Sequence, residues 1–347
     1  MRVKEQLEKL EGLTLSPFAS FARTSRGRER SEEECPVRTA FQRDRDRIIH
    51  CKAFRRLKGK TQVYPNPTGD HYRTRLTHTL EVSQIARTLA CGLRLNENLA
   101  EAIALGHDLG HTPFGHAGAF ALDEAIRQVL PERHFLHQEQ SLRVVDLLEG
   151  LLQADGTEQV GLNLTWEVRD GILHHSKGED DLDLAGPSTL EGRLVRLADR
   201  LACLSHDTDD ALRAGTLQPE DLPDRRLFGF GASRLIEVVV EDVIERSCDQ
   251  GEILLGKELT AKLDILNDFL FRQVYRDPIA KREENRAGRM VQLLFRSYME
   301  NPELMGLDRS ADLPTREQAA TDYVAGMTDR FATQAFSDLF LPEPWEG

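Results

Sequence analysis

Histidine and aspartate gather in one short stretch, from Gly106 to Gly118, which reads G-H-D-L-G-H-T-P-F-G-H-A-G. Three histidines and one aspartate lie within ten residues there, and His107 and Asp108 are adjacent. Neighbouring side chains on a helix diverge by about a third of a turn, so this pair can face one ion only where a helix ends. Gly106 and Gly110 allow such an end. Taken alone, the pair fits a polar helix end with a glycine cap better than a metal site.

Two residues from other segments favour the metal site. His78 begins one upstream helix, and Asp199 lies midway along a later one among apolar neighbours. A carboxylate in apolar surroundings needs a partner, which a cation supplies. Together with His107 and Asp108, they offer two imidazoles and two carboxylates. This donor set suits a divalent first-row metal and leaves positions open for water or a substrate oxygen.

The residues around this centre indicate which reaction a metal would serve. His111 and His116 lie close to it in sequence, outside the four ligands, and histidine can act as a general acid or base at neutral pH. Arg75, three residues before His78, can bind phosphate oxygens bidentately. Metal, histidine and arginine together fit hydrolysis of a phosphoester or phosphoanhydride. No nucleophile motif for acyl transfer accompanies them, and the absence of G-x-x-x-x-G-K-[ST] excludes a P-loop NTPase.

Composition and charge limit what the protein binds. The 347 residues are 40% hydrophobic and 30% charged, without a membrane-length apolar run or a signal peptide, so we expect a soluble cytoplasmic protein with no membrane partner. The net charge of −13 argues against a general nucleic-acid surface. Residues 1–75 nevertheless hold 18 Lys and Arg against 10 Asp and Glu, whereas the remainder holds 27 against 48. This local excess suggests one small polyanion such as a nucleotide, although a solvated face or a subunit contact better explains any single arginine.

Apolar residues recur at helical spacing through most of the chain, which predicts an all-α fold. After a short N-terminal helix, we expect helices near residues 38–57, 77–90, 96–109, 116–130, 137–152, 166–175, 190–213, 235–246, 259–275, 279–298 and 316–340. Prolines and a Gly-Asp pair before Arg73 indicate a loop, or at most a short β-ribbon near Gln62. Thr77 is the expected N-cap of the helix that carries His78, with Glu81 as its capping-box partner.

These elements predict a single mainly α domain over residues 1–347. Its metal-binding core would cover about residues 60–215, and a C-terminal helical extension would cover 216–347. The five cysteines form no C-x-x-C pair, so we expect neither a disulfide framework nor a structural zinc site.

The helix expected over residues 190–213 carries polar residues on one face. Cys203, His206, Asp207 and Asp210 follow Asp199 at offsets of four, seven, eight and eleven residues, which places all five in one stripe. An acidic stripe is usually a solvated face, and we expect Asp210 to be solvated.

Taken together, His78, the His107–Asp108 doublet and Asp199 resemble the signature of HD-domain phosphohydrolases. Four longer strings are similar to the bacterial deoxyguanosine-triphosphate triphosphohydrolase (dGTPase) family: R-D-R-D-R-I-I-H-C-K-A-F-R-R-L, D-H-Y-R-T-R-L-T-H-T-L-E-V, H-D-L-G-H-T-P-F-G-H and A-G-M-T-D-R-F. The similarity spans about residues 20–340. It implies an HD-domain helical core with additional C-terminal helices, often assembled as a homo-hexamer. It also implies hydrolysis of a dNTP, with dGTP favoured, to deoxynucleoside and triphosphate, with Mn²⁺ or Mg²⁺ as cofactor.

The resemblance also implies roles for individual residues. Four match the family's metal ligands: His78, His107, Asp108 and Asp199. Five match positions that contact substrate: Gln62, Arg75, His137, Asp207 and Tyr323. Among these, Gln62 and Asp207 would read the 3′-hydroxyl, and Tyr323 would lie at the nucleoside end. His116 matches the catalytic histidine beside the α-phosphate, with His111 close to it.

Three positions depart from the family pattern. The family continues G-H-x-G-E at the catalytic histidine, whereas this chain has Ala119, on the same helix face as His116. The missing carboxylate would orient His116 or move its proton, and losing such a partner typically costs about 10²–10⁴-fold in rate. Cys203 stands where tyrosine is usual, and His174 stands where lysine is common. We therefore expect weaker sugar stacking, one weaker phosphate contact and impaired catalysis.

Two other functions remain open beside dNTP hydrolysis. One is an HD phosphodiesterase or nucleotidase for mono- or cyclic nucleotides, which would need fewer arginines than residues 43–75 hold. The other is a non-catalytic oligomer that senses nucleotides or binds single-stranded DNA, which the alanine at position 119 favours.

Overall fold

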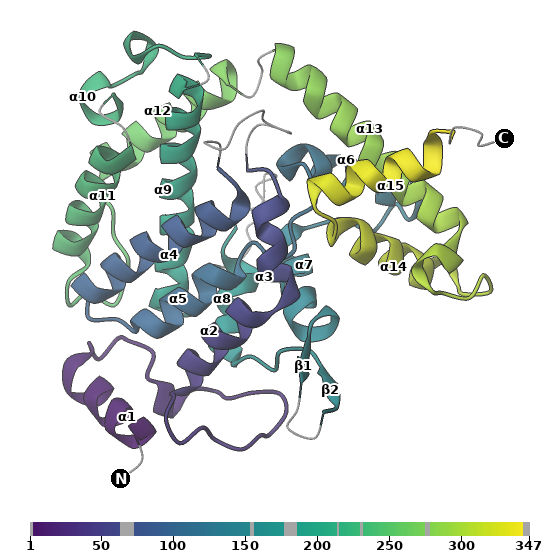
Figure 1. Ribbon diagram of the computed structural model, residues 1–347. Helices are drawn as coiled ribbons and strands as arrows, with labels where there is room; N and C mark the ends of the chain where they lie inside the picture. Colours follow the sequence, from purple (N-terminus) through teal and green to yellow (C-terminus); the bar gives the residue numbers. More distant parts are fainter. Residues whose placement is uncertain are drawn as a thin grey trace.

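Helices are the main elements of the computed structural model, which describes residues 3–62, 73–152, 156–176, 186–213, 215–229, 232–274 and 278–342. The helices of the N-terminal two thirds are α1 (Val3–Thr14), α2 (Ala40–His50), α3 (Lys52–Arg56), α4 (Arg75–Gly92), α5 (Glu97–Gly106), α6 (Gly115–Val129), α7 (His137–Arg143), α8 (Trp166–His174) and α9 (Leu190–Arg213). They are followed by α10 (Arg225–Phe228), α11 (Ala232–Ser247), α12 (Lys257–Gln273), α13 (Pro278–Glu300), α14 (Leu313–Ala325) and α15 (Asp329–Phe340). The expected all-α fold is confirmed (Figure 1).

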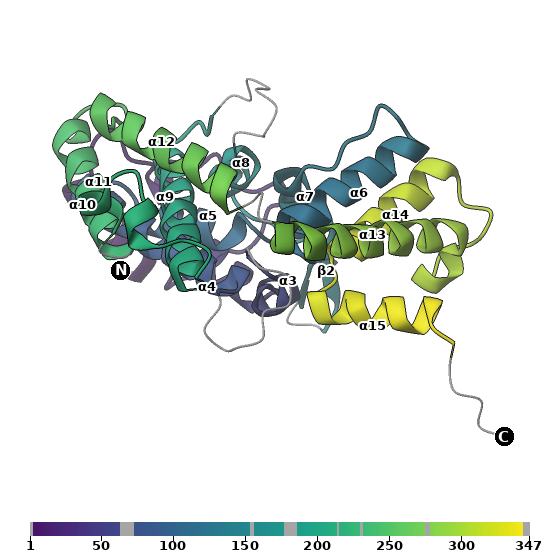
Figure 2. The ribbon, with the colours of Figure 1, turned by 90° about the horizontal axis from the view of Figure 1, so that it is seen from above.

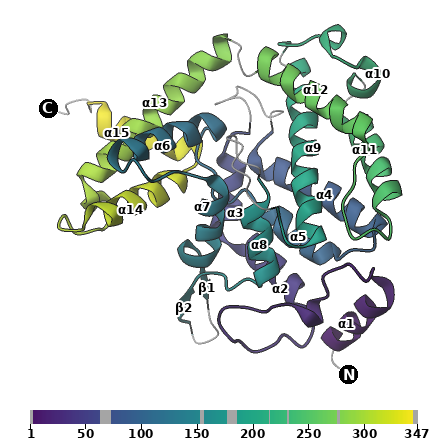
Figure 3. The same ribbon diagram turned by 180° about the vertical axis from the view of Figure 1, so that it is seen from behind.

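The larger of two hydrophobic cores surrounds α5 and α9. Leucine, isoleucine, valine and alanine side chains from α2, α4, α5, α8, α9, α11 and α12 meet there, and Leu89, Ile103 and Val195 are fully buried. Helix α9 lies between α8 and α11 (Figure 3). Since α4, α5 and α9 pack directly on one another, residues at their facing positions are held close together.

The second core joins one helix of the expected metal-binding part to the C-terminal helices. Leu122 of α6 packs with Val291 and Phe295 of α13 and with Val324 of α14. Figure 2 shows α6, α13, α14 and α15 grouped at one side of the molecule, away from α9 to α12. Helix α6 therefore belongs, by its packing, with the C-terminal helices.

The small sheet lies elsewhere than the sequence suggests. Strands β1 (Gly150–Leu152) and β2 (Glu158–Val160) form an antiparallel hairpin after α7, with Leu151 opposite Gln159. Beside Gln62, the structure has an isolated antiparallel bridge between Thr61 and Thr74. The rest of that loop, residues 63–72, lies outside the described residues.

Four of the expected helices also differ from the structure. The helix expected over 38–57 is interrupted at Cys51, which ends α2 and caps α3. Thr74, not Thr77, is the N-cap of α4, and Thr77 completes its capping box. The helix expected over 137–152 becomes a π-turn at Val144–Leu148 and then strand β1. The helix expected over 316–340 is broken after Ala325, because Gly326 ends α14 and Thr328 accepts the first hydrogen bond of α15. None of the described helices has the length and apolar character that crossing a bilayer requires.

Candidate metal centre

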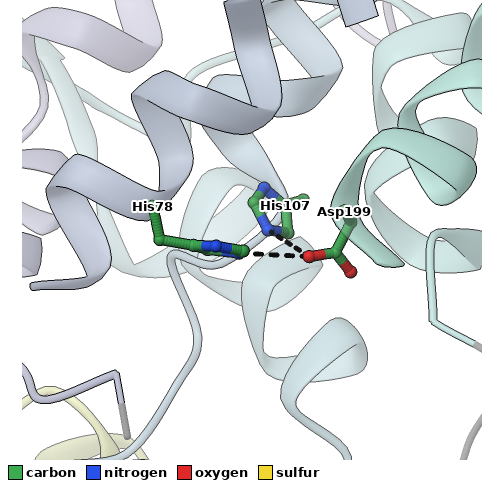
Figure 4. Close-up of side chains that lie close together, drawn as sticks. All are labelled: His78, His107 and Asp199. Atoms are coloured by element: carbon green, nitrogen blue, oxygen red, sulfur yellow. Dashed lines mark hydrogen bonds and ion pairs between the residues drawn. The ribbon is translucent and has the colours of Figure 1, made fainter. Parts of the chain in front are cut away.

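Three packed helices bring His78, His107 and Asp199 together. His78 lies in the first turn of α4, His107 follows the last residue of α5, and Asp199 lies midway along α9. Figure 4 shows both imidazoles directed at the carboxylate of Asp199. Nε2 of His78 is 3.1 Å from Oδ1 of Asp199, and Nε2 of His107 is 3.7 Å from the same oxygen.

Asp108 lies against the same cluster. Its Oδ1 is 3.4 Å from Nε2 of His107, and its Oδ2 is 3.9 Å from Nε2 of His78. This arrangement is possible because α5 ends at Gly106, so the adjacent side chains of His107 and Asp108 no longer diverge as in a helix. The structure thus brings together all four residues that the sequence proposes as ligands.

The donor set fits a divalent cation. Nδ1 of His107 is 2.6 Å from the carbonyl oxygen of Ala104, to which it donates, so Nε2 is the nitrogen that faces the two carboxylates. In the described part of the chain, that buried nitrogen has no hydrogen-bond partner. Two imidazoles and two carboxylates with open positions between them form a mixed N/O site for a first-row metal.

The electrostatics of the cluster agree with this interpretation. Burial opposes protonation of His107, but Asp108 and Asp199 raise its pKa to about 9. Against the effect of burial, His107 and Arg75 hold the pKa of Asp108 well below its usual range. His107 and His78 do the same for Asp199. Two ionised carboxylates thus lie in a buried site, where a cation would neutralise them and displace the proton of His107.

Further histidines line the side of the cluster that faces α6 and α7. Nε2 of His111 is 3.4 Å from Oδ1 of Asp108, and its ring stacks on His137 with centroids 4.1 Å apart. The ring of His116 meets His111 edge-on at 5.7 Å. Desolvation by the surrounding protein lowers the pKa of His111 and His137 well below the usual range, and desolvation with the charge of Arg75 lowers that of His116 to about 4. In this state the three rings are neutral at pH 7.

Ala119 lines a cavity that reaches His116. The cavity has a volume of about 690 Å³, and His137 and Asp123 also contribute to its wall. Asp123 lies one turn further along α6 than Ala119. Its carboxylate accepts a hydrogen bond from the backbone N–H of Phe135. Ala119, where the resemblance predicts a carboxylate, thus faces open space beside His116.

Gln62 and Asp207 lie on the α9 side of the centre. Nε2 of Gln62 is 4.0 Å from Sγ of Cys203, which in turn is 3.7 Å from Oδ1 of Asp199. Oε1 of Gln62 is buried without a hydrogen-bond partner among the described residues. Burial and the charge of Asp210 raise the pKa of Asp207 to about 8, so this acid is largely protonated at neutral pH.

Asp210 is not solvated, contrary to the sequence-based expectation. It is 3% exposed, and its Oδ1 is 2.7 Å from a guanidinium nitrogen of Arg73. Arg73 precedes α4 in the chain and also pairs with Asp209 and Glu81. Glu81 therefore does not cap α4; its carboxylate meets Arg73 and the ring of His206.

Tyr323 stands apart from these residues. Its ring meets Tyr298 and Phe331 on the outer helices, at centroid distances of 4.8 and 6.5 Å. It is 38% exposed and lines a separate cavity of about 570 Å³ whose wall includes Gly110. Its placement at the nucleoside end of a substrate is therefore not evident from its contacts.

Three residues near the centre were given no role from the sequence, although His206 was placed in the polar stripe of α9. Nδ1 of His206 is 3.3 Å from Nδ1 of His78, and Nε2 of His175 is 3.3 Å from Nε2 of His137. Lys60 is buried, and burial with the charges of Arg56 and Arg75 lowers its pKa to about 7. The available signals were weak: the double histidine H-H-S for His175 and the K-G-K-T-Q string for Lys60.

Comparison with known proteins identifies relatives along the whole chain. The HD domain model matches residues 75–204, and the phosphohydrolase-associated domain model matches residues 253–338. A "Deoxyguanosinetriphosphate triphosphohydrolase-like protein" of Caldanaerobacter subterraneus subsp. tengcongensis is 51% identical over 99% of this chain and 98% of its own length. Proteins of the same name from Desulfatibacillum aliphaticivorans and Clostridium perfringens are 46% and 43% identical, each over 99% of both chains. All four candidate ligands lie within the residues that the HD domain model matches.

Proposed function

Because this chain belongs to the family of deoxyguanosinetriphosphate triphosphohydrolase-like proteins, we propose that it is a metal-dependent dNTP triphosphohydrolase with dGTP as favoured substrate. The products would be a deoxynucleoside and inorganic triphosphate. The main support is the cluster of His78, His107 and Asp199, with Asp108 close to both histidines and paired with a buried arginine. That arginine, Arg75, offers charge for a polyphosphate at the point where the reaction needs it.

The four residues would hold Mn²⁺ or Mg²⁺. When bound, such an ion polarises a phosphoryl oxygen and acidifies water. His107 is fixed for this role by its hydrogen bond to Ala104, and Asp108 by its ion pair with Arg75.

Arg75 would bind a phosphate. It is 1% exposed, and one of its terminal nitrogens donates to Asp108. Nε and the other terminal nitrogen have no hydrogen-bond partner within the described residues. Leaving such charged donors unsatisfied is costly, and phosphate oxygens would accept from both in a fork geometry.

His116 would transfer the proton to the leaving 5′-oxygen, with His111 and His137 beside the phosphates. The low pKa of His116 makes its imidazolium a strong acid, but little of it is protonated at neutral pH. A bound polyphosphate would raise that pKa, and a carboxylate at position 119 would raise it further. With alanine there, we propose that this chain turns substrate over slowly.

The deoxyribose would lie against α9. A protonated Asp207 can both donate to and accept from the 3′-hydroxyl, and the unsatisfied Oε1 of Gln62 offers a second acceptor. By resemblance, Tyr323 would lie at the nucleoside end. By resemblance, we also propose a cytoplasmic homo-oligomer, with a hexamer as the favoured form.

The test is a product analysis with a matched variant. The chain and its Ala119→Glu variant are incubated with dGTP and Mn²⁺, and the products are separated by ion exchange. We expect deoxyguanosine and triphosphate in equal amounts, formed about 10²–10⁴-fold faster by the glutamate variant.

Other products would contradict the proposal. Pyrophosphate or orthophosphate from dGTP would do so, and hydrolysis of mono- or cyclic nucleotides alone would indicate an HD phosphodiesterase or nucleotidase. Tight binding of dGTP or single-stranded DNA without turnover, even in Ala119→Glu, would indicate a non-catalytic oligomer.

A further inference from the structure

A carboxylate from the C-terminal helices reaches two loops at the candidate active site. Oδ1 of Asp329, the first residue of α15, accepts a hydrogen bond of 2.9 Å from the backbone N–H of Phe114. Its Oδ2 accepts a bond of 2.9 Å from the backbone N–H of Thr61 and a second from the Thr61 hydroxyl. One side chain thus joins two segments that are more than fifty residues apart in the sequence.

Both loops lead directly to residues of the proposed active site. Thr61 precedes Gln62, and Phe114 stands two residues before His116. Phe114 has φ of 62° and Gly115 has φ of 59°, so the turn into α6 is left-handed at two successive residues. The left-handed conformation costs a residue with a bulky side chain about 1–3 kcal/mol, and it is kept only where neighbouring groups hold the backbone in place. A carboxylate fixed on the N–H of Phe114 is such a neighbour.

The two loops also touch each other. A Cβ on Gly115 would lie 3.2 Å from the carbonyl oxygen of Gln62, so there is no spare room between the loop and the turn. The side-chain ammonium of Lys60 adds a second tie, since it donates to the carbonyl of His111 and, at 2.8 Å, to that of Ala325. The relative position of Gln62 and His116 is therefore set through the segment 325–329.

The carboxylate of Asp329 is not needed to start its own helix. Thr328 caps α15 by accepting from the N–H of Phe331. The C-terminal helices are also anchored elsewhere, by the core that α6 shares with α13 and by the forked ion pair of Arg143 with Asp322. Removing the contacts of Asp329 should therefore loosen the two loops without detaching the helices.

We propose that Asp329 is a positioning residue for the proposed hydrolase: it holds the sugar-contact candidate Gln62 and the proton donor His116 in register. The inference rests on the proposed function of this site. The four candidate ligands are held by α4, α5 and α9, without contact to Asp329 among the bonds of the described residues. Loss of Asp329 should accordingly separate hydrolysis from metal binding.

The test compares Asp329→Asn and Thr61→Val with Asp312→Asn. Asp312 is a matched control because it lies in the same C-terminal region. Among the hydrogen bonds of the described residues, its carboxylate accepts only from the N–H of Thr315, in the helix α14 that it caps. Three quantities are measured: amide hydrogen exchange of peptides spanning residues 61–62 and 113–116, the Mn²⁺ dissociation constant by calorimetry, and kcat and KM for dGTP. Kinetics are measured in the Ala119→Glu background as well as in the chain itself.

For Asp329→Asn we expect faster exchange in both peptides, an Mn²⁺ affinity within about twofold of the parent, and a kcat/KM lower by about 10²-fold. Thr61→Val keeps the backbone bonds and should show a smaller loss in the same direction. Asp312→Asn should change none of the three. If Asp329→Asn fails to fold, Thr61→Val carries the test.

Two results would overturn the proposal. One is unchanged exchange and kinetics in the variants that lack the contact. The other is a parallel fall of Mn²⁺ affinity, thermal midpoint and activity, which would show general destabilisation. If the parent and Ala119→Glu proteins release no triphosphate, the proposed function fails, while exchange and Mn²⁺ binding still decide the role of Asp329.

Discussion

One terminal nitrogen of Arg75 lies 2.8 Å from Oδ2 of Asp108, and both side chains are almost completely buried. The arginine thus holds a candidate metal ligand with one nitrogen and leaves two others free of protein partners in the described structure. Arg75 would thereby connect the candidate metal ligands to the proposed phosphate-binding position.

Replacing Arg75 with methionine should therefore weaken nucleotide binding more than metal binding. Hydrogen bonds to charged groups contribute about 1.5–3 kcal/mol, which corresponds to an affinity loss of about ten- to hundredfold for dGTP. Loss of the ion pair frees Asp108 but also removes a charge that repels the cation, so the two effects on Mn²⁺ affinity oppose each other and the net change should be smaller than that for dGTP. Both affinities can be measured by calorimetry. Arg87→Met, an exposed arginine of the same helix paired with Glu97, serves as control, and equal losses of both ligands would contradict the assignment.

His107→Ala should remove metal binding. The variant loses the imidazole between the two carboxylates, and we expect Mn²⁺ affinity to fall by about 10²-fold or more. His174→Ala is the matched control, because His174 lies on the neighbouring helix α8 and its ring meets Asp170. Calorimetric titration with Mn²⁺ measures both. An unchanged affinity in His107→Ala would exclude this site as the metal centre.

Asp207→Asn should stabilise the protein at high pH. Folding raises the pKa of Asp207 from 3.8 to about 8. An acid whose pKa is raised by folding contributes its full share to the free energy of unfolding below its unfolded pKa. That contribution is lost as the pH rises through its folded pKa. Asparagine stays neutral and loses no such contribution. The free energy of unfolding of the variant relative to the parent should therefore increase between about pH 4 and pH 8 and stay constant above pH 8.

Guanidinium unfolding of both proteins at about pH 5, 7 and 9 measures this difference. Asp209→Asn, whose carboxylate is partly exposed and paired with Arg213, is the control. A difference between the Asp207→Asn variant and the parent that is constant over this range would show that Asp207 titrates normally.

Gly110→Ala should destabilise the fold strongly. A Cβ at this position would lie 2.2 Å from the backbone nitrogen of Ser141, so α7 would have to move. Overpacking of this kind costs about 1–3 kcal/mol or more. Gly12→Ala is the counterpart, since nothing lies within 4 Å of its Cβ position in helix α1, and it should stabilise by up to about 1 kcal/mol. Thermal unfolding measures both, and equal midpoints for the two variants would contradict the packing described.

Helical periodicity predicts most of this fold because each helix buries a stripe of its own sequence. The helix expected over residues 190–213 has those bounds in the structure. The break between α14 and α15 is the exception, since apolar spacing continues across it and only Gly326 and Thr328 mark the turn. The N-cap at Thr74 was missed for a related reason: three threonines stand close together, and only the backbone decides which one caps.

The candidate ligands could be recognised because each is marked by its sequence neighbours. Asp199 stands among apolar residues, and glycines flank the His107–Asp108 doublet. Asp329 stands in the string A-G-M-T-D-R-F, but nothing beside it or beside Lys60 indicates their partners, because these contacts join residues 268 and 265 positions apart. Asp210 was placed wrongly because its partner, Arg73, arrives from a loop whose path the sequence does not reveal.

The helix that carries His116 is packed in a different core from the helices that carry His78, His107 and Asp199. In the proposed reaction, the separation of His116 from the four candidate ligands would therefore depend on how these two cores pack against each other. Anything that shifts α13 relative to α4, whether a neighbouring subunit or a bound molecule, would move His116 away from the bound metal while every candidate ligand stayed in place. Activity could then be switched off at full metal occupancy.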